Sequence, residues 1–159
     1  MFEVGDKVVY PMHGAGIIES IEEKEILGEK KKYYVMKMPF GEMKVMIPIG
    51  NANDIGIRDV IDKSIADEVF CSLELKNPIQ TSNWNKRYRE NMSKIKSGDV
   101  FDVAEVVRDL ILRERVKGLS TGERKMLNNA KNILISELVL AEGMKPSEVE
   151  DLINDKISL

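Results

Sequence analysis

Short runs of apolar residues, alternating with polar ones, occupy the N-terminal third of the chain. A period of two is the pattern of a strand with one buried face, and turn residues separate the runs at intervals of about eight to twelve residues. The spacing predicts a small, strongly bent β-barrel of the SH3-like or Tudor-like kind. Strands are expected at residues 7–10, 17–21, 32–38 and 43–47, and turns at Gly14-Ala15-Gly16, Gly28-Glu29-Lys30 and residues 39–42.

Beyond a turn-rich linker at residues 51–59, the hydrophobic period becomes helical. Apolar residues spaced three and four apart give a helix one buried stripe, so the second half of the chain is predicted to be a helical bundle. We therefore expect an α+β protein with a barrel domain over residues 1–59 and a helical domain over residues 60–159. Helices are expected near residues 65–73, 84–95, 99–118, 120–143 and 146–155, with Lys76-Asn77-Pro78 ending the first of them.

One predicted helix begins with the only tryptophan of the chain, Trp84, which three cations follow closely. Ser82 or Asn83 can cap this helix. Its apolar stripe consists of Tyr88, Met92 and Ile95, whereas Lys86, Arg87 and Arg89 fall mostly elsewhere. Two interpretations of Trp84 remain open. The indole either extends the stripe into the core, or forms a flat wedge ringed by phosphate-binding cations, as in minor-groove intercalation.

The net charge of −3 argues against a protein that coats nucleic acid generally. The charge is distributed unevenly, however. Residues 84–131 contain twelve basic and seven acidic side chains, a local balance of +5, and the rest of the chain is acidic. Any nucleic-acid-binding surface is therefore expected within this window.

The remaining composition restricts the possible functions. Cys71 and His13 are the only cysteine and histidine, so we expect neither an intramolecular disulfide nor a metal site, and no cofactor is indicated. No nucleophile, base and orienting group cluster along the sequence, so an enzyme is the most remote alternative and no catalytic residue is assigned. The absence of a signal-peptide pattern and of a long apolar span indicates a cytoplasmic protein.

Three stretches carry a family resemblance: VGDKVVYPMHGAG at residues 4–16, NWNKRYR at residues 83–89 and DVAEVVRDL at residues 102–110. Together they resemble the CarD/CdnL family of bacterial transcription regulators over nearly the whole chain. The first half is also similar to the RNA-polymerase-interacting module of the transcription-repair coupling factor. The combination of Trp84 with LSTGERKML at residues 119–127 makes the resemblance more specific.

The resemblance implies that the barrel docks on the β subunit of RNA polymerase and that the helices touch promoter DNA at the upstream edge of the melted bubble. The family's minor-groove wedge corresponds to Trp84. On the surface that would bind polymerase, family positions that are often basic correspond to Lys24 and Met46. Ile26, expected between strands, belongs to the same implied surface. Met46 carries no charge, so an apolar or strand-edge contact would replace a salt bridge there. The implied DNA-contacting cations are Arg87, Arg89 and Arg124, with Lys86 and Lys125 as neighbours.

Two functions from different classes follow. The first is a regulator that docks on polymerase and stabilises the open promoter complex by inserting Trp84. The second is a protein-interaction adaptor with a polymerase-binding barrel and no direct DNA contact. Salt-dependent protection of the promoter distinguishes them, because phosphate contacts weaken as salt rises. We expect a monomer that reaches the nucleoid through polymerase and binds promoter DNA weakly, largely independently of base sequence.

Overall fold

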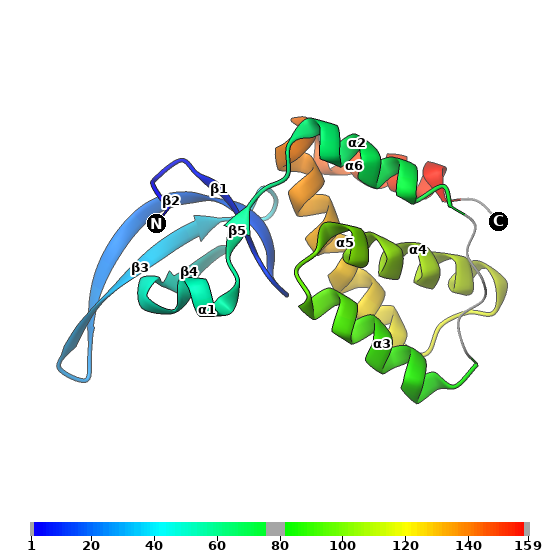
Figure 1. Ribbon diagram of the computed structural model, residues 1–159, viewed down its shortest axis with the longest axis horizontal. Helices are drawn as coiled ribbons and strands as arrows, with labels where there is room; N and C mark the ends of the chain where they lie inside the picture. The colour runs from blue at the N-terminus through cyan, green and yellow to red at the C-terminus, as the bar shows by residue number, and fades with distance from the viewer. Residues whose placement is uncertain (1, 76–81, 158–159) are drawn as a thin grey trace.

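The computed structural model describes residues 2–75 and 82–157 of the protein. A bent sheet formed by the N-terminal third lies beside a group of helices formed by the rest (Figure 1). The expected α+β fold, with a small β-domain followed by helices, is confirmed. The Lys76-Asn77-Pro78 signal predicted to end the first helix lies outside the described residues.

The sheet is antiparallel, with the strand order β4-β3-β2-β1-β5. β2 and β3 are longer than predicted and continue as an exposed hairpin beyond the core. Leu27 and Gly28 form its turn with φ values of 53° and 81°, because a tight hairpin requires positive φ at both central residues. The turn expected at Gly28-Glu29-Lys30 therefore begins one residue earlier. The strands are β1 (Lys7–Tyr10), β2 (Gly14–Ile26), β3 (Glu29–Lys37), β4 (Lys44–Pro48) and β5 (Arg58–Asp59).

The turn-rich linker expected at residues 51–59 contains short regular elements. The 3₁₀ helix η1 (Ile49–Asn51) and the short helix α1 (Ala52–Ile55) lead into β5, which pairs with β1 through Val8 and Val9. Elements this short contain too few side chains to produce a hydrophobic period. Their sequence, rich in Asn, Asp and Gly, therefore indicated only turns.

The helices begin and end close to their predicted bounds. Side chains of Asp62, Asn83, Asp99 and Ser120 cap their N-termini by accepting backbone N–H bonds. Gly143 ends α5 in the left-handed conformation, with φ of 69°. The helices are α2 (Lys63–Ser72), α3 (Trp84–Lys96), α4 (Val100–Val116), α5 (Thr121–Glu142) and α6 (Pro146–Lys156).

Two hydrophobic cores lie within the described residues. The sheet encloses one around Ile18, Tyr34 and Met36. The helices pack around α4, whose Val107 and Leu110 are fully buried. Separate cores allow the two parts to present different surfaces.

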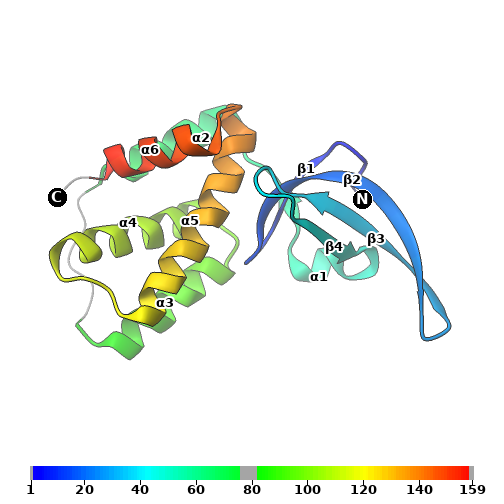
Figure 2. The same cartoon turned by 180° about the vertical axis from the view of Figure 1, so that it is seen from behind.

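The Trp84 end of α3 and the β2–β3 hairpin lie at opposite ends of the molecule in both views (Figures 1 and 2). α5 runs from beside the start of α3 to the sheet, where Ser136 bonds Ala15. No helix in the described parts of the chain is long and apolar enough to cross a membrane.

Candidate nucleic-acid interface

The first turn of α3 places Trp84 at the surface. Asn83 caps the helix, because its Oδ1 accepts a hydrogen bond from the backbone N–H of Lys86 at 3.2 Å. Trp84 is the first helical residue, and its side chain is 41 % exposed. The core interpretation of Trp84 is therefore wrong, although the ring still lies at the outer end of the apolar stripe.

Three neighbours fix the orientation of the indole. Its ring stacks on Tyr88, with centroids 4.9 Å apart and planes inclined by 21°. Its Nε1 donates a hydrogen bond to Ser120 Oγ at 3.0 Å. The ring also lies against Gly122, where a Cβ atom would stand 3.6 Å from Trp84 Cζ2. Stacking and a directional bond hold the exposed part of the ring in one orientation before any ligand arrives.

Ser120 links the first turns of α3 and α5. Its Oγ accepts the backbone N–H of Glu123 at 3.2 Å and donates to Glu123 Oε1 at 3.3 Å. The capping role expected of Ser120 is confirmed. Its bond to Trp84 joins residues 36 positions apart, so helical periodicity alone did not predict it.

Arg87 does not lie on the exposed face where the sequence analysis placed it. It is 2 % exposed, and its Nε and Nη2 donate to the two carboxylate oxygens of Glu123 at 2.8 and 3.0 Å. Arg87, Asn91 and Ile95 are the buried residues of α3 and follow one another at a spacing of four. Arg87 stands one position before Tyr88 of the predicted apolar stripe, and its pairing with Glu123 allows a charged side chain to be buried there.

The buried ion pair shifts the titration of its carboxylate. Hydrogen bonding to Arg87 lowers the pKa of Glu123 below its usual value, while burial opposes that shift. The carboxylate therefore stays ionised at neutral pH and neutralises the guanidinium. Arg87 is consequently buried beneath the first turns of α3 and α5, with its charge paired to Glu123.

The other predicted cations lie on the two helices whose first turns meet at Trp84. Lys86 and Arg89 are exposed on α3, and Arg124 and Lys125 are exposed on α5. Two of them form long ion pairs: Lys86 Nζ lies 4.0 Å from Glu90 Oε1, and Arg124 Nε lies 3.9 Å from Glu114 Oε1. Such exposed pairs contribute little to stability, so the cations can exchange them for phosphate. We call Trp84 with these four cations the Trp84 tip.

Comparison with known proteins identifies the family. Residues 68–154 match the CarD C-terminal domain, and residues 2–61 match the CarD-like/TRCF RID domain. The chain belongs to the CarD family. The putative transcription factor YdeB of Bacillus subtilis is 43 % identical to it over 150 residues, 94 % of this chain and 98 % of YdeB. The expected CarD resemblance is thus confirmed, and CarD-like proteins are transcription regulators that interact with RNA polymerase.

Two further likenesses of this CarD-family chain cover only parts of the proteins compared. The Lon protease of Xanthomonas oryzae pv. oryzae is 28 % identical over 146 residues, which span 81 % of this chain and 16 % of the protease. The solution NMR structure of the 72-residue N-terminal domain of Myxococcus xanthus CarD is 36 % identical. That match covers 37 % of this chain and 79 % of the solved one, with a TM-score of 0.33.

The residues that the CarD resemblance assigns to polymerase do not form one cluster. Lys24 lies on the outer part of β2 opposite Lys31, and Ile26, expected between strands, is the last residue of β2. Met46 lies on the edge strand β4 opposite Val35. Their partners on β3, Lys31 and Val35, are four positions apart, a distance of about 13 Å along the strand. Ile26 and Met46 are nevertheless exposed, at 49 % and 36 %.

A metal site in this CarD-family protein would require several ligands close together. Residues 2–75 and 82–157 contain no group of three or more His, Cys, Asp or Glu side chains that could hold a metal ion. His13 is exposed, and its ring packs 4.3 Å from that of Tyr10, between centroids. Cys71 is a free, exposed thiol.

Proposed function

We propose that this CarD-family protein docks on the β subunit of RNA polymerase through residues 1–59 and stabilises the open promoter complex through residues 60–159. Trp84 would insert into the minor groove at the upstream edge of the melted DNA. The observation that carries this proposal is the partly exposed indole, held by Tyr88 and Ser120 among cations from two helices. The protein would act as a monomer in the cytoplasm, at the nucleoid.

Insertion favours the open complex only if the indole binds unstacked DNA more tightly than stacked duplex. A flat apolar ring gains contact between separated bases, and an intact stack must first be opened at a cost of a few kcal/mol. The held orientation of Trp84 reduces the entropy that insertion would cost. Insertion therefore lowers the free energy of the melted state relative to the closed one.

The four exposed cations supply the attraction to the phosphates. Lys86, Arg89, Arg124 and Lys125 belong to this proposed set, and Arg87 is removed from it because Glu123 holds it in the interior. Phosphate contacts position a protein on DNA without reading its sequence. We therefore propose weak contact that is largely independent of base sequence.

Docking on polymerase compensates for weak DNA affinity. The edge strand β4 carries Met46, and the exposed hairpin carries Lys24 and Ile26, so a partner strand could add to the sheet beside them. A docked protein experiences a high local concentration of promoter DNA. The proposed role of the Trp84 tip does not depend on which barrel residues dock or on which polymerase subunit they contact. Docking and the role of the tip can therefore be tested separately.

Replacement of Trp84 tests the proposal. Trp84→Ala should cost about 1–2 kcal/mol of stability, because the stack on Tyr88 and one hydrogen bond are lost without opening a buried cavity. It should bind polymerase normally but fail to prolong the open complex. Trp84→Phe should retain part of the effect, since a flat ring can still insert. The measurements are open-complex lifetime, polymerase affinity and thermal melting.

Phe101→Ala is a matched control, because Phe101 is a 37 % exposed aromatic residue on α4 outside the Trp84 tip. Its effect on lifetime should be small. A Trp84→Ala protein that prolongs the open complex as well as the parent would overturn the wedge. If the parent binds polymerase but gives no salt-dependent protection of the promoter, the adaptor function is correct instead.

A further inference from the structure

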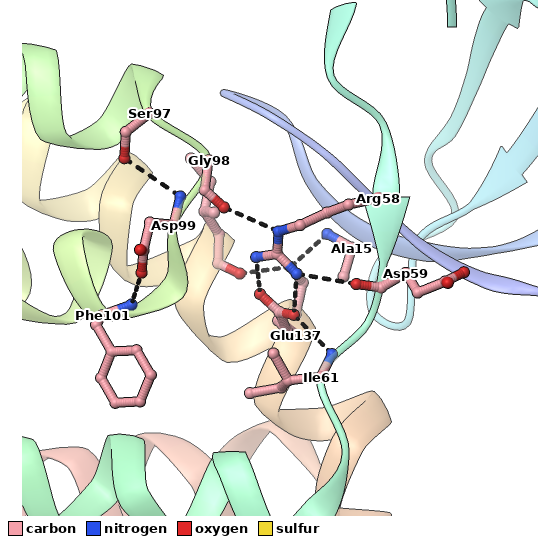
Figure 3. Close-up of polar contacts among 11 residues, drawn as sticks. Ala15, Arg58, Asp59, Ile61, Ser97, Gly98, Asp99, Phe101 and Glu137 are labelled. Atoms are coloured by element: carbon pink, nitrogen blue, oxygen red, sulfur yellow. Dashed lines mark hydrogen bonds and ion pairs between the residues drawn. The ribbon is translucent and has the colours of Figure 1, made fainter. Parts of the chain in front are cut away.

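A partly buried charged contact joins the sheet to the helices (Figure 3). Glu137 of α5 is 3 % exposed, and its Oε2 and Oε1 accept hydrogen bonds from Nη1 and Nη2 of Arg58, both at 2.7 Å. Oε2 also accepts the backbone N–H of Ile61 at 3.0 Å. Bidentate guanidinium–carboxylate pairs are among the most directional contacts in proteins. Arg58 belongs to β5, and Ile61 follows that strand. The Glu137 carboxylate therefore holds both β5 and the segment that leads from it to α2.

The same arginine reaches a third element. Its Nε donates to the carbonyl oxygen of Gly98, in the turn between α3 and α4, at 2.9 Å (Figure 3). Gly98 therefore ties the end of α3 to the sheet, and α3 begins with Trp84. We call Arg58 and Glu137, with Ile61 N–H and Gly98 C=O, the Arg58–Glu137 clasp.

A second contact lies beside the clasp. Ser136 Oγ accepts the buried backbone N–H of Ala15 in β2 at 2.8 Å. The strand approaches α5 so closely that a Cβ atom at Gly14 would lie 2.8 Å from Ser136 Oγ. Gly14 also has φ of 113°, which other residues rarely adopt. Ser136 and Glu137, consecutive residues of α5, thus hold β2 and β5 respectively. Two points of attachment restrict rotation of the sheet relative to α5 as well as its separation from α5.

We propose that Arg58 and Glu137 are positioning residues that fix the orientation of the sheet relative to the Trp84 tip, so that docking itself delivers the indole to the DNA. This inference rests on the proposed function. Domains joined by modest interfaces normally move relative to one another, and buried ion pairs often contribute specificity of geometry more than stability. The β2–β3 hairpin and the N-terminal end of α3, where Trp84 stands, lie at opposite ends of the molecule (Figure 1), so a small rotation at the clasp displaces Trp84 substantially.

The test removes the bidentate bond while keeping the size of the side chain. Glu137→Gln leaves an amide that cannot accept both Arg58 donors, and Arg58→Lys is a second, milder variant that keeps the charge. The matched control is Glu150→Gln, which breaks the pair of Lys131 and Glu150 between α5 and α6 (2.9 Å), away from the sheet. Thermal melting confirms that each full-length variant is folded.

Two quantities are then compared. The first is the distribution of distances between spin labels at Asp54→Cys and Asn128→Cys, exposed positions on α1 and α5, in a Cys71→Ser background because that thiol is exposed. The second is the lifetime of the open complex at saturating protein. We expect Glu137→Gln to broaden the distances and to shorten the lifetime about five- to tenfold, with unchanged polymerase affinity. Arg58→Lys should produce the same changes to a smaller degree, and Glu150→Gln neither.

If the distribution of distances between the spin labels is unchanged in Glu137→Gln, the clasp does not fix the orientation of the sheet, and the inference is overturned. Broader distances with the parental lifetime would show that DNA engagement does not need a fixed orientation, which would also overturn the inference. A parent protein that does not prolong the open complex would instead contradict the proposed function. The distance distribution would still test the clasp in that case, so the two failures are distinguishable.

Discussion

Arg87 and Arg89 stand two positions apart in α3 and have different surroundings. Arg87 faces the interior and binds the Glu123 carboxylate, whereas Arg89 is exposed and its Nε donates to the Asn85 carbonyl at 3.4 Å. Residue type therefore does not decide which arginine can meet a phosphate. The side of the helix on which the arginine lies decides it. Residues four apart share one side, so Arg87 lies with the buried Asn91 and Ile95, and Arg89 does not.

The Arg87–Glu123 pair makes stability dependent on pH. Glu123→Gln should lower the free energy of unfolding by about 3 kcal/mol at pH 7, because it leaves a buried guanidinium without its carboxylate. The lowered pKa of Glu123 in the folded state means that its contribution is present above the unfolded value of 4.5 and is lost as pH falls through the folded value. The difference between parent and variant should therefore shrink below about pH 4.5. Denaturant unfolding across this pH range measures it.

Glu19→Gln is the control for this experiment. Its carboxylate also pairs with a cation, Lys44, at 2.9 Å, and that hydrogen bond lowers the pKa of Glu19. Both side chains are substantially exposed, so solvent screens the pair and its loss should leave stability almost unchanged. Equal losses in the two variants would show that the burial of Arg87 has no energetic consequence.

The helices were predictable from sequence because each has a long apolar stripe and most have a capping side chain. α5 shows this clearly: Ser120 and Gly143 mark its ends, and Leu127 and Leu134 lie on its buried face. The segment around α1 and β5 lacked both signals. Of the candidate site, the exposed Trp84 and four of the cations follow from local pattern and resemblance. The contacts of Ser120 with Trp84 and of Arg58 with Glu137 do not, since they join residues distant in sequence.

The two helices that form the Trp84 tip should contribute to DNA binding in the same way. Arg89→Ala on α3 and Arg124→Ala on α5 should each weaken the promoter effect at every promoter tested, because phosphate contacts are independent of base sequence. Each should also reduce the slope of log affinity against log salt by about 1. Titrations of the polymerase–promoter complex at several salt concentrations give this slope. Arg87→Ala should instead lower thermal stability.

Lys63→Ala serves as the control for these variants, since Lys63 is an exposed cation at the start of α2 and lies outside the tip. Its salt slope should equal that of the parent. An arginine variant whose loss is confined to one promoter sequence would contradict a phosphate role and indicate that the side chain reads a base edge.

The proposed docking and DNA-contacting surfaces lie at opposite ends of the molecule, so substitutions should separate their effects. The hairpin that carries Lys24 projects away from the helices, and the Trp84 tip lies at their far end (Figures 1 and 2). A defect in docking lowers occupancy of the polymerase, which added protein can restore. A defect in the tip persists at full occupancy.

Lys24→Glu should therefore weaken binding to polymerase without lowering the melting temperature, because an exposed lysine contributes little to the fold. Its promoter effect should recover as protein concentration is raised, whereas that of Trp84→Ala should not. Lifetime measurements over a concentration series check this difference. Lys63→Glu is the charge-matched control, and binding of Lys24→Glu that equals the control would remove Lys24 from the docking surface.

Trp84 is the only tryptophan of the chain, and it begins α3, whose N-terminal end lies far from the β2–β3 hairpin (Figure 1). Indole emission, excited selectively over tyrosine, therefore originates entirely from the tip. Insertion beside a base would replace water around the ring by a π-system that quenches its fluorescence. Under the proposed insertion, the unmodified protein would carry its own optical reporter of DNA engagement, which would not respond to changes in the sheet.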